Sequence, residues 1–248
     1  MERKGQRLLA ALAALAVWQI TAMALHNPLL LATPVQVAGR LLALLPTGSF
    51  WLSLGNSFLR IVGGFLMALV LAVLLSALSA RFPIIETLLR PYVSVIRSVP
   101  VASFIVIALL WLSARRLSVF ISFLMVFPVL YTNLLQGIRS ADPKLRQMAA
   151  VFRMSPLRRV RAIFVPAVRP YFLSGARSGL GLCWKAGVAA EVIAVASNTV
   201  GGRLYDAKVS LEIAELFAWT AVIVLVSVGF EWLFLRFSEW ALDRWEGR

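Results

Sequence analysis

Apolar residues gather in six long stretches of this 248-residue chain, and polar residues lie mainly between them. A helix needs about 20 apolar residues to cross a hydrocarbon core of about 30 Å. We therefore predict membrane-spanning helices at about 8–25, 61–80, 93–114, 117–138, 171–196 and 216–235. The pattern indicates an all-α, polytopic integral membrane protein, with a single transmembrane domain over residues 1–248.

The composition supports a lipid environment. Apolar residues make up 60% of the chain and charged residues 15%, against about 25% charged residues in a typical soluble domain. A soluble fold of this length still exposes roughly a quarter to a third of its unfolded surface. A soluble enzyme and a disulfide-stabilised secreted protein are therefore excluded as classes.

The net charge of +14 follows the loops. If the N-terminus is cytoplasmic, the inner segments hold 17 Lys and Arg residues and the outer segments hold 6. Because cytoplasmic loops of membrane proteins collect Lys and Arg, this asymmetry predicts that both termini face the cytoplasm. It also explains the positive charge without a nucleic-acid partner.

The loop at 139–170 carries the clearest helix signals outside the spans. Asp142-Pro143 is a typical helix start, because Asp caps free N–H groups and Pro suits the first helical turn. Leu145, Met148, Ala149 and Phe152 then share one face. Ser155-Pro156 repeats the start signal, and Pro166 and Pro170 are expected to end the segment. We predict two short helices, either lying on anionic lipid or docking a cytoplasmic partner through apolar anchors.

The same loop resembles the EAA loop of ABC importer permeases. Gln147-Met148-Ala149, Arg153 and the run from Ile163 to Pro166 match the spacing of the family pattern, Glu-Ala-Ala, three residues, Gly, nine residues, Ile-x-Leu-Pro. Gln147 stands where Glu is usual and Arg153 where Gly is usual. These departures bear on the turn geometry at Arg153 and on any charge contact made by residue 147.

The resemblance extends along the chain to the sulfonate/nitrate/taurine branch of these permeases, through the segments 33–37, 59–65, 127–128 and 188–191 together with Pro91, Pro100 and Gly137. It implies a subunit of the bacterial cytoplasmic membrane with two ATPase copies, a second permease copy forming a homodimer, and an external substrate-binding protein. It also implies that the loop docks the ATPase, through Leu145, Gln147, Met148, Ala149, Phe152, Arg153, Ser155, Ile163 and Pro166.

Catalytic and cofactor signals are lacking in the sequence. The chain has no Gly-x-x-x-x-Gly-Lys-Ser/Thr motif, so it is not expected to hydrolyse ATP by the P-loop route. It has one Cys and one His, which offer no metal-ligand cluster. We predict a subunit that is not an enzyme and needs no cofactor or metal.

The fifth span is the most polar one. Charges at bilayer depth are costly and usually face a cavity or a partner, so Lys185 and Glu191 are candidates for the transport pathway, with Trp184 beside Lys185. Alternatively, Lys185 extends to the membrane interface or pairs with Glu231 or a lipid phosphate. Lys185 and Glu191 are six residues apart, about 240° around a helix, so they are not expected to pair.

These observations favour a permease subunit of an ATP-driven importer for a small solute, with an oxyanion such as a sulfonate, nitrate or taurine as the expected cargo. The same architecture could import a vitamin precursor or another small organic solute. Two other classes stay open at this point. An ion-coupled secondary carrier would need intramembrane carboxylates such as Glu191 and Glu231, and a membrane scaffold would use the basic loop to bind lipid or RNA.

Overall fold

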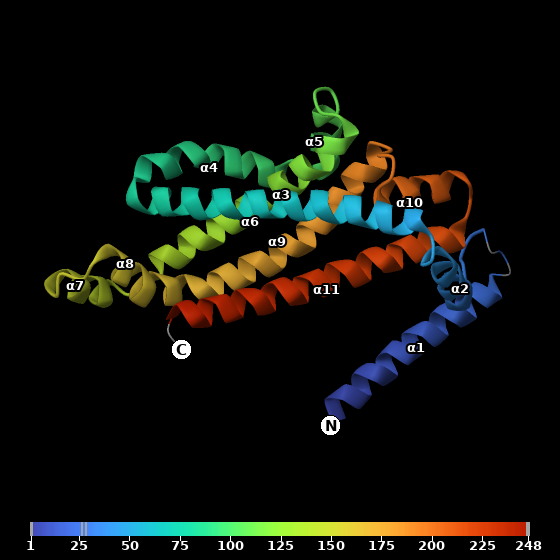
Figure 1. Cartoon of the computed structure of the whole chain (residues 1–248), viewed down its shortest axis with the longest axis horizontal. Coiled ribbons are helices and arrows are strands. Elements are labelled where there is room, and N and C mark those ends of the chain that lie inside the picture. The colour runs from blue at the N-terminus through green and yellow to red at the C-terminus, as the bar shows by residue number, and fades with distance from the viewer. Residues whose placement is uncertain (1, 26, 28, 247–248) are drawn as a thin grey trace.

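The computed structural model describes residues 2–25, 27 and 29–246, and every regular element in them is a helix (Figure 1). The side chains of residues 2–4, 7, 8, 11 and 246 are outside this description. The elements in chain order are α1 (Glu2–Ala24), α2 (Pro34–Leu44), α3 (Gly48–Arg81), α4 (Pro83–Ser98), α5 (Val101–Ala108), α6 (Ala114–Arg139), α7 (Pro143–Val151), α8 (Pro156–Arg159), the π-helix η1 (Val160–Phe164), α9 (Val165–Ile193), α10 (Val200–Val209) and α11 (Ile213–Glu246).

Three of these helices, α3, α6 and α11, are long and apolar enough to cross a membrane. The bent pair of α4 and α5 is a fourth if it forms one broken span. The predicted spans at 8–25 and 171–196 coincide with α1 and α9, but neither helix meets the same length and hydropathy criteria over its described residues. The all-helical prediction is thus confirmed, and three to four helices have the length and composition to cross a membrane.

The predicted span at 93–114 is not one helix. The chain bends by 103° between α4 and α5, and turns replace helix from Leu109 to Ser113. The residue before a proline avoids the helical region, and Val99, which precedes Pro100, has extended backbone angles (φ −84°, ψ 133°). Pro100 therefore breaks the helix inside the predicted span.

The core lies among α3, α6 and α9, where α6 packs along both of its neighbours. Small residues allow this close approach. A Cβ added at Gly64 would lie 2.4 Å from the Val119 carbonyl oxygen, and one at Gly187 would lie 2.5 Å from Ser122 Oγ. Phe65, Leu130 and Leu180 fill the space between the three helices.

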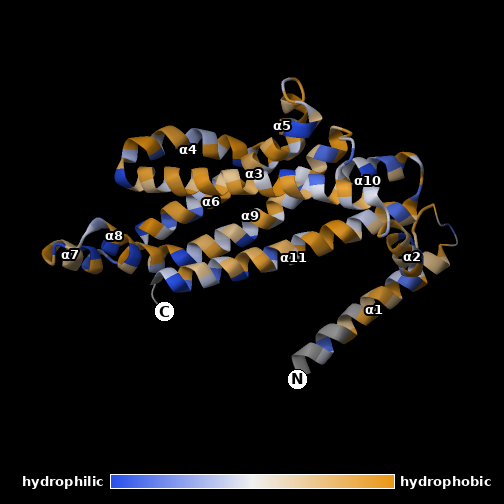
Figure 2. Ribbon diagram, viewed as in Figure 1, coloured by the Kyte–Doolittle hydropathy of each residue, from blue (hydrophilic) through white to orange (hydrophobic). Residues whose placement is uncertain are grey.

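Much of the apolar surface stays uncovered by the chain itself. Hydrophobic residues run along nearly all of α3 and α11 (Figure 2), yet only 17% of the most apolar window of α11 is buried. Trp232, Leu225 and Val228 are among its exposed side chains. Because such a surface is unfavourable in water, it is suited to contact lipid or another subunit.

The connections collect at two ends of the long helices. One end, here the α7 end, carries the α3–α4 turn, α7, α8 and the C-terminal part of α11; the opposite end, here the α10 end, carries α2 and α10 (Figure 1). Ion pairs fasten both ends. Arg139 binds Glu86 at the α7 end, and Arg40 binds Glu212 and Glu215 at the α10 end. The segments predicted to be cytoplasmic near 81, at 139–170 and after 236 thus gather at one end.

Candidate docking surface and candidate pathway

The start of α7 forms as its sequence predicts. Asp142 Oδ1 accepts a hydrogen bond of 2.7 Å from the Lys144 backbone N–H, and Pro143 occupies the first turn, where its missing N–H has no helical partner to lose. The cap fixes the direction in which α7 leaves the end of α6.

The end of α7 is a Schellman turn with Arg153 in the left-handed region, at φ 48°. The Arg153 N–H donates to the Ala150 carbonyl at 3.1 Å, and the Met154 N–H donates to the Ala149 carbonyl at 2.9 Å. Arg153 therefore makes the turn for which the EAA pattern uses glycine. A non-glycine residue costs about 1–2 kcal/mol in this conformation.

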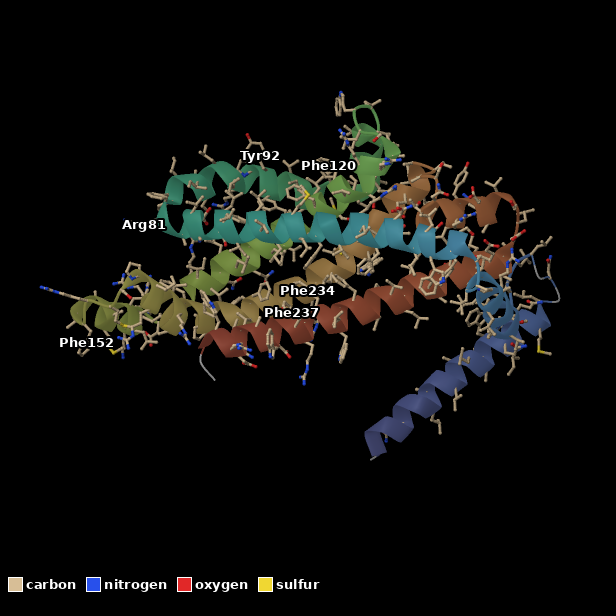
Figure 3. All side chains as sticks on the ribbon, in the orientation of Figure 1. Arg81, Tyr92, Phe120, Phe152, Phe234 and Phe237 are labelled. Carbon is tan, nitrogen blue, oxygen red and sulfur yellow. The ribbon has the colours of Figure 1, made fainter. Side chains whose placement is uncertain are left out.

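The apolar face of α7 divides into an outer and an inner part. Leu145 and Met148 are partly exposed and Phe152 is 74% exposed, at the tip of the molecule (Figure 3). Ala149 and Ile163 are buried, because they pack together beneath α7 with Ala141. Ala149 and Ile163 therefore hold α7 against η1, whereas Leu145, Met148 and Phe152 lie on its outer side.

The second predicted helix of the loop does not end before the membrane. Ser155 precedes α8, which continues through η1 into α9 without a break, so Pro166 and Pro170 do not terminate it. Pro166 lies in the first turn of α9, where a proline costs little, and Pro170 is accommodated inside α9. Gln147 and Ser155 are exposed on the loop surface.

Two of the three candidate pathway residues point into the chain. Trp184 is buried in the main core, and its ring centroid lies 6.0 Å from that of Phe58, with an angle of 52° between the ring planes. Glu191 is fully buried, and its Oε2 accepts hydrogen bonds from Ser57 Oγ (2.7 Å) and the Gly201 N–H (3.1 Å). Glu191 thereby ties the start of α10 to α3 and α9.

Lys185 lies on the other side of α9 and is exposed. Glu231, one of the partners expected for it, instead lies 3.6 Å from Arg177. None of the ion pairs among the described residues includes Lys185. Its exposed position in the polar helix keeps it available to a ligand, a second subunit or a lipid headgroup.

A polar hollow between α4 and α6 was not predicted. It has a volume of about 630 Å³, and Arg97 lies in it with Nη2 2.8 Å from Thr132 Oγ1. Ser94 and Ser98 add hydroxyl groups to the same wall. The signal in the sequence was Arg97 itself, a charge inside an otherwise apolar segment.

No group of His, Cys, Asp and Glu residues able to hold a metal ion occurs in the described part of the chain.

Replacing Arg153 by Gly is expected to stabilise the protein by about 1 kcal/mol, because glycine adopts the left-handed conformation without strain. The thermal unfolding midpoint in detergent should rise by roughly 2–4 °C. Arg158→Gly is the matched control: Arg158 lies in α8, so glycine there should lower the midpoint. An Arg153→Gly protein that unfolds below the wild type would contradict this account of the turn.

Comparison with known proteins identifies the family. Residues 68–240 match the family described as binding-protein-dependent transport system inner membrane component. One relative is a putative aliphatic sulfonates transport permease protein of Bacillus subtilis. It is 28% identical to this chain, and the aligned region covers 93% of this chain and 84% of the relative. The taurine transport system permease protein of Escherichia coli is 27% identical, and the aligned region covers 93% of this chain and 85% of the relative. The bicarbonate transport system permease protein of Synechococcus elongatus is 28% identical, and the aligned region covers 81% of this chain and 70% of the relative.

The matched region runs from the middle of α3 to the last turns of α11, so it includes α7, the core helices and the candidate pathway residues. Members of this family are membrane subunits of transporters rather than enzymes. The chain belongs to the inner membrane components of binding-protein-dependent transport systems, as an ABC permease.

Proposed function

We propose that this chain forms the membrane pathway of an ATP-driven importer and that a separate ATPase binds the outer face of α7. The observation that carries the proposal is the helix α7 itself, which is capped at both ends and presents Leu145, Met148 and Phe152 at one end of the molecule. Apolar anchors at helical spacing are a usual way for a helix to dock in a groove. Movement of the ATPase would pass through α8 and η1 into α9.

Two ATPase copies, a second permease copy and an external binding protein complete the proposed assembly. The family description supports an external binding protein, and the large exposed apolar surface supports contact with lipid and a second copy. Both termini and α7 would face the cytoplasm, because the count of Lys and Arg residues over the whole chain favours that side for the N-terminal segment and for the segments near 81, at 139–170 and after 236.

The proposed cargo is a small oxyanion of the sulfonate type. The relatives named for aliphatic sulfonates, taurine and bicarbonate have an oxyanion in common: taurine carries a sulfonate group, and bicarbonate is a carbon oxyanion. Arg97 and Lys185 are cations on the exposed sides of α4 and α9, where a pathway shared with a second copy could run. A vitamin precursor without negative charge would gain nothing from them.

The contacts of Glu191 and Glu231 disfavour an ion-coupled carrier. Such a carrier needs carboxylates that exchange protons or sodium with a cavity. Glu191 is enclosed and bonded to Ser57 and Gly201, and Glu231 faces Arg177. Both are engaged in holding helices together.

Uptake by proteoliposomes tests the proposed function. The chain, the ATPase and the binding protein encoded beside it would be reconstituted together, with radiolabelled taurine, ethanesulfonate or bicarbonate outside and ATP inside. We expect ATP-dependent accumulation of at least one of these anions, lost when either partner is omitted. Accumulation that needs an ion gradient but neither ATP nor partners would overturn the proposal.

Lys185→Met is expected to lower the initial rate of anion uptake about tenfold, because losing one charge-assisted contact costs about 1.5–3 kcal/mol. Lys185→Arg keeps the charge and should retain most of the rate. Lys208→Met, which removes an exposed lysine of α10, serves as the control. Equal uptake by Lys185→Met and the wild type, at equal protein abundance, would leave Lys185 without a role in the pathway.

A further inference from the structure

A second hollow, of about 800 Å³, lies away from α7. Residues of α3, of the corner between α5 and α6, and of the loop that follows α9 line it. Its lining residues include three arginines, Arg60, Arg115 and Arg116, and the apolar residues Met67, Phe120 and Phe123. Neutral polar residues, Asn56, Ser197 and Asn198, complete the polar side. Figure 3 shows Phe120 beside this corner. We call this the three-arginine hollow.

The three-arginine hollow has an excess of positive charge. Among the residues that the structure describes, no Asp or Glu lines it. The ion pairs found among the described residues involve none of the three arginines. Glu191 interacts electrostatically with Arg60, but its Oε2 is bonded to Ser57 and Gly201, and Arg60 Nη1 is buried without a hydrogen-bond partner. A buried donor without a partner costs about 1–3 kcal/mol, so an anionic oxygen near it would be stabilised.

The position of Arg115 and Arg116 leads to the same conclusion. Both lie in the first turn of α6, whose N-cap Ser113 makes no side-chain capping hydrogen bond. The N-terminal end of a helix carries partial positive charge, so two cations there repel it. An anion in the hollow would offset this repulsion and accept hydrogen bonds from the guanidinium groups.

The apolar side indicates what else the ligand carries. Met67, Phe120 and Phe123 could cover a short hydrocarbon chain, while the arginines hold its charged end. We propose that the three-arginine hollow binds an anion of this form, a sulfonate or phosphate group with an attached hydrocarbon. The inference rests on the proposed function and deepens it, because it assigns the importer a place where an alkanesulfonate is held away from the ATPase. An anionic lipid headgroup has the same chemistry.

The test uses the purified full-length chain in nanodiscs of phosphatidylcholine, without ATPase or ATP. Binding of hexane-1-sulfonate, ethanesulfonate and inorganic sulfate would be measured by titration calorimetry. We expect affinity to rise with chain length, by up to about fourfold per buried methylene. Arg115→Gln/Arg116→Gln should weaken hexane-1-sulfonate binding about tenfold or more. Arg115→Lys/Arg116→Lys should retain most of the binding.

Lys208→Gln/Arg236→Gln is the control, because it removes the same net charge from two exposed positions outside the hollow. Nanodiscs with equal parts of phosphatidylcholine and phosphatidylglycerol separate the two ligand sources. If phosphatidylglycerol removes the difference in hexane-1-sulfonate affinity between the wild type and Arg115→Gln/Arg116→Gln, the natural ligand is a lipid headgroup; if the difference persists, the ligand is a small anion.

Hexane-1-sulfonate binding that is absent from the wild type, or equal in the wild type and in Arg115→Gln/Arg116→Gln, would overturn the inference. Failure of ATP-driven uptake with sulfonate binding intact would count against the proposed function alone. The two failures are thus distinguishable.

Discussion

Replacing Phe152 by Asp is expected to abolish uptake and to release the ATPase from the purified complex. Phe152 is 74% exposed at the tip of the chain, so the substitution places a charge where the account puts an apolar contact, without disturbing the core. Losing an aromatic anchor at an interface costs more than about 2 kcal/mol, and a buried unpaired carboxylate adds to that cost. Co-purification of the ATPase and ATP-driven uptake would both be measured.

Two controls separate docking from folding. Val209→Asp places the same charge on an exposed apolar position of α10, at the opposite end of the molecule, and should leave ATPase binding unchanged. Arg158→Gln should have a small effect, because exposed charges are well solvated and contribute little. A Phe152→Asp protein that still binds ATPase and transports solute would show that α7 is not the docking helix.

Replacing Gly64 by Ala is expected to cause the largest loss of stability among the glycine-to-alanine substitutions in α3. The new Cβ would lie 2.4 Å from the Val119 carbonyl oxygen and 2.8 Å from Ser122 Cβ, so α6 would have to move away from α3. Overpacking of this kind costs about 1–3 kcal/mol. The thermal midpoint in detergent should fall by roughly 3–10 °C.

The neighbouring glycine provides the control. A Cβ at Gly63 meets no atom within 4 Å, so Gly63→Ala should be neutral or slightly stabilising in the same helix. Equal midpoints for the two variants would contradict the close contact between α3 and α6 on which the packing of the core depends.

The helices were largely predictable because their signals are local. Asp142-Pro143 predicted the start of α7, and long apolar stretches predicted α6 and the central parts of α3 and α11. The errors occurred at prolines, whose effect depends on position. Pro100 breaks its segment, whereas Pro166 and Pro170 lie within α9 because they fall near the start of a helix that is already continuous with η1.

The candidate sites depended more on contacts between distant segments. The exposure of Phe152 follows from its place at the end of α7, but the burial of Ala149 depends on Ile163, which packs beneath it. Likewise, Lys185 and Trp184 are adjacent in sequence, yet Trp184 is buried in the core and Lys185 is exposed. The three-arginine hollow brings together residues from 56–67, 112–123 and 197–198, and no local pattern predicts that they meet.

Site-specific photocrosslinking tests most directly the claim that α7 receives the ATPase. A benzoylphenylalanine at position 152 would be compared with one at position 110, where Leu110 is equally exposed at the α5–α6 corner. In membranes containing the whole assembly, the account predicts a covalent adduct of the permease and the ATPase from position 152, and none from position 110. No adduct from position 152, or equal adducts from both, would contradict it.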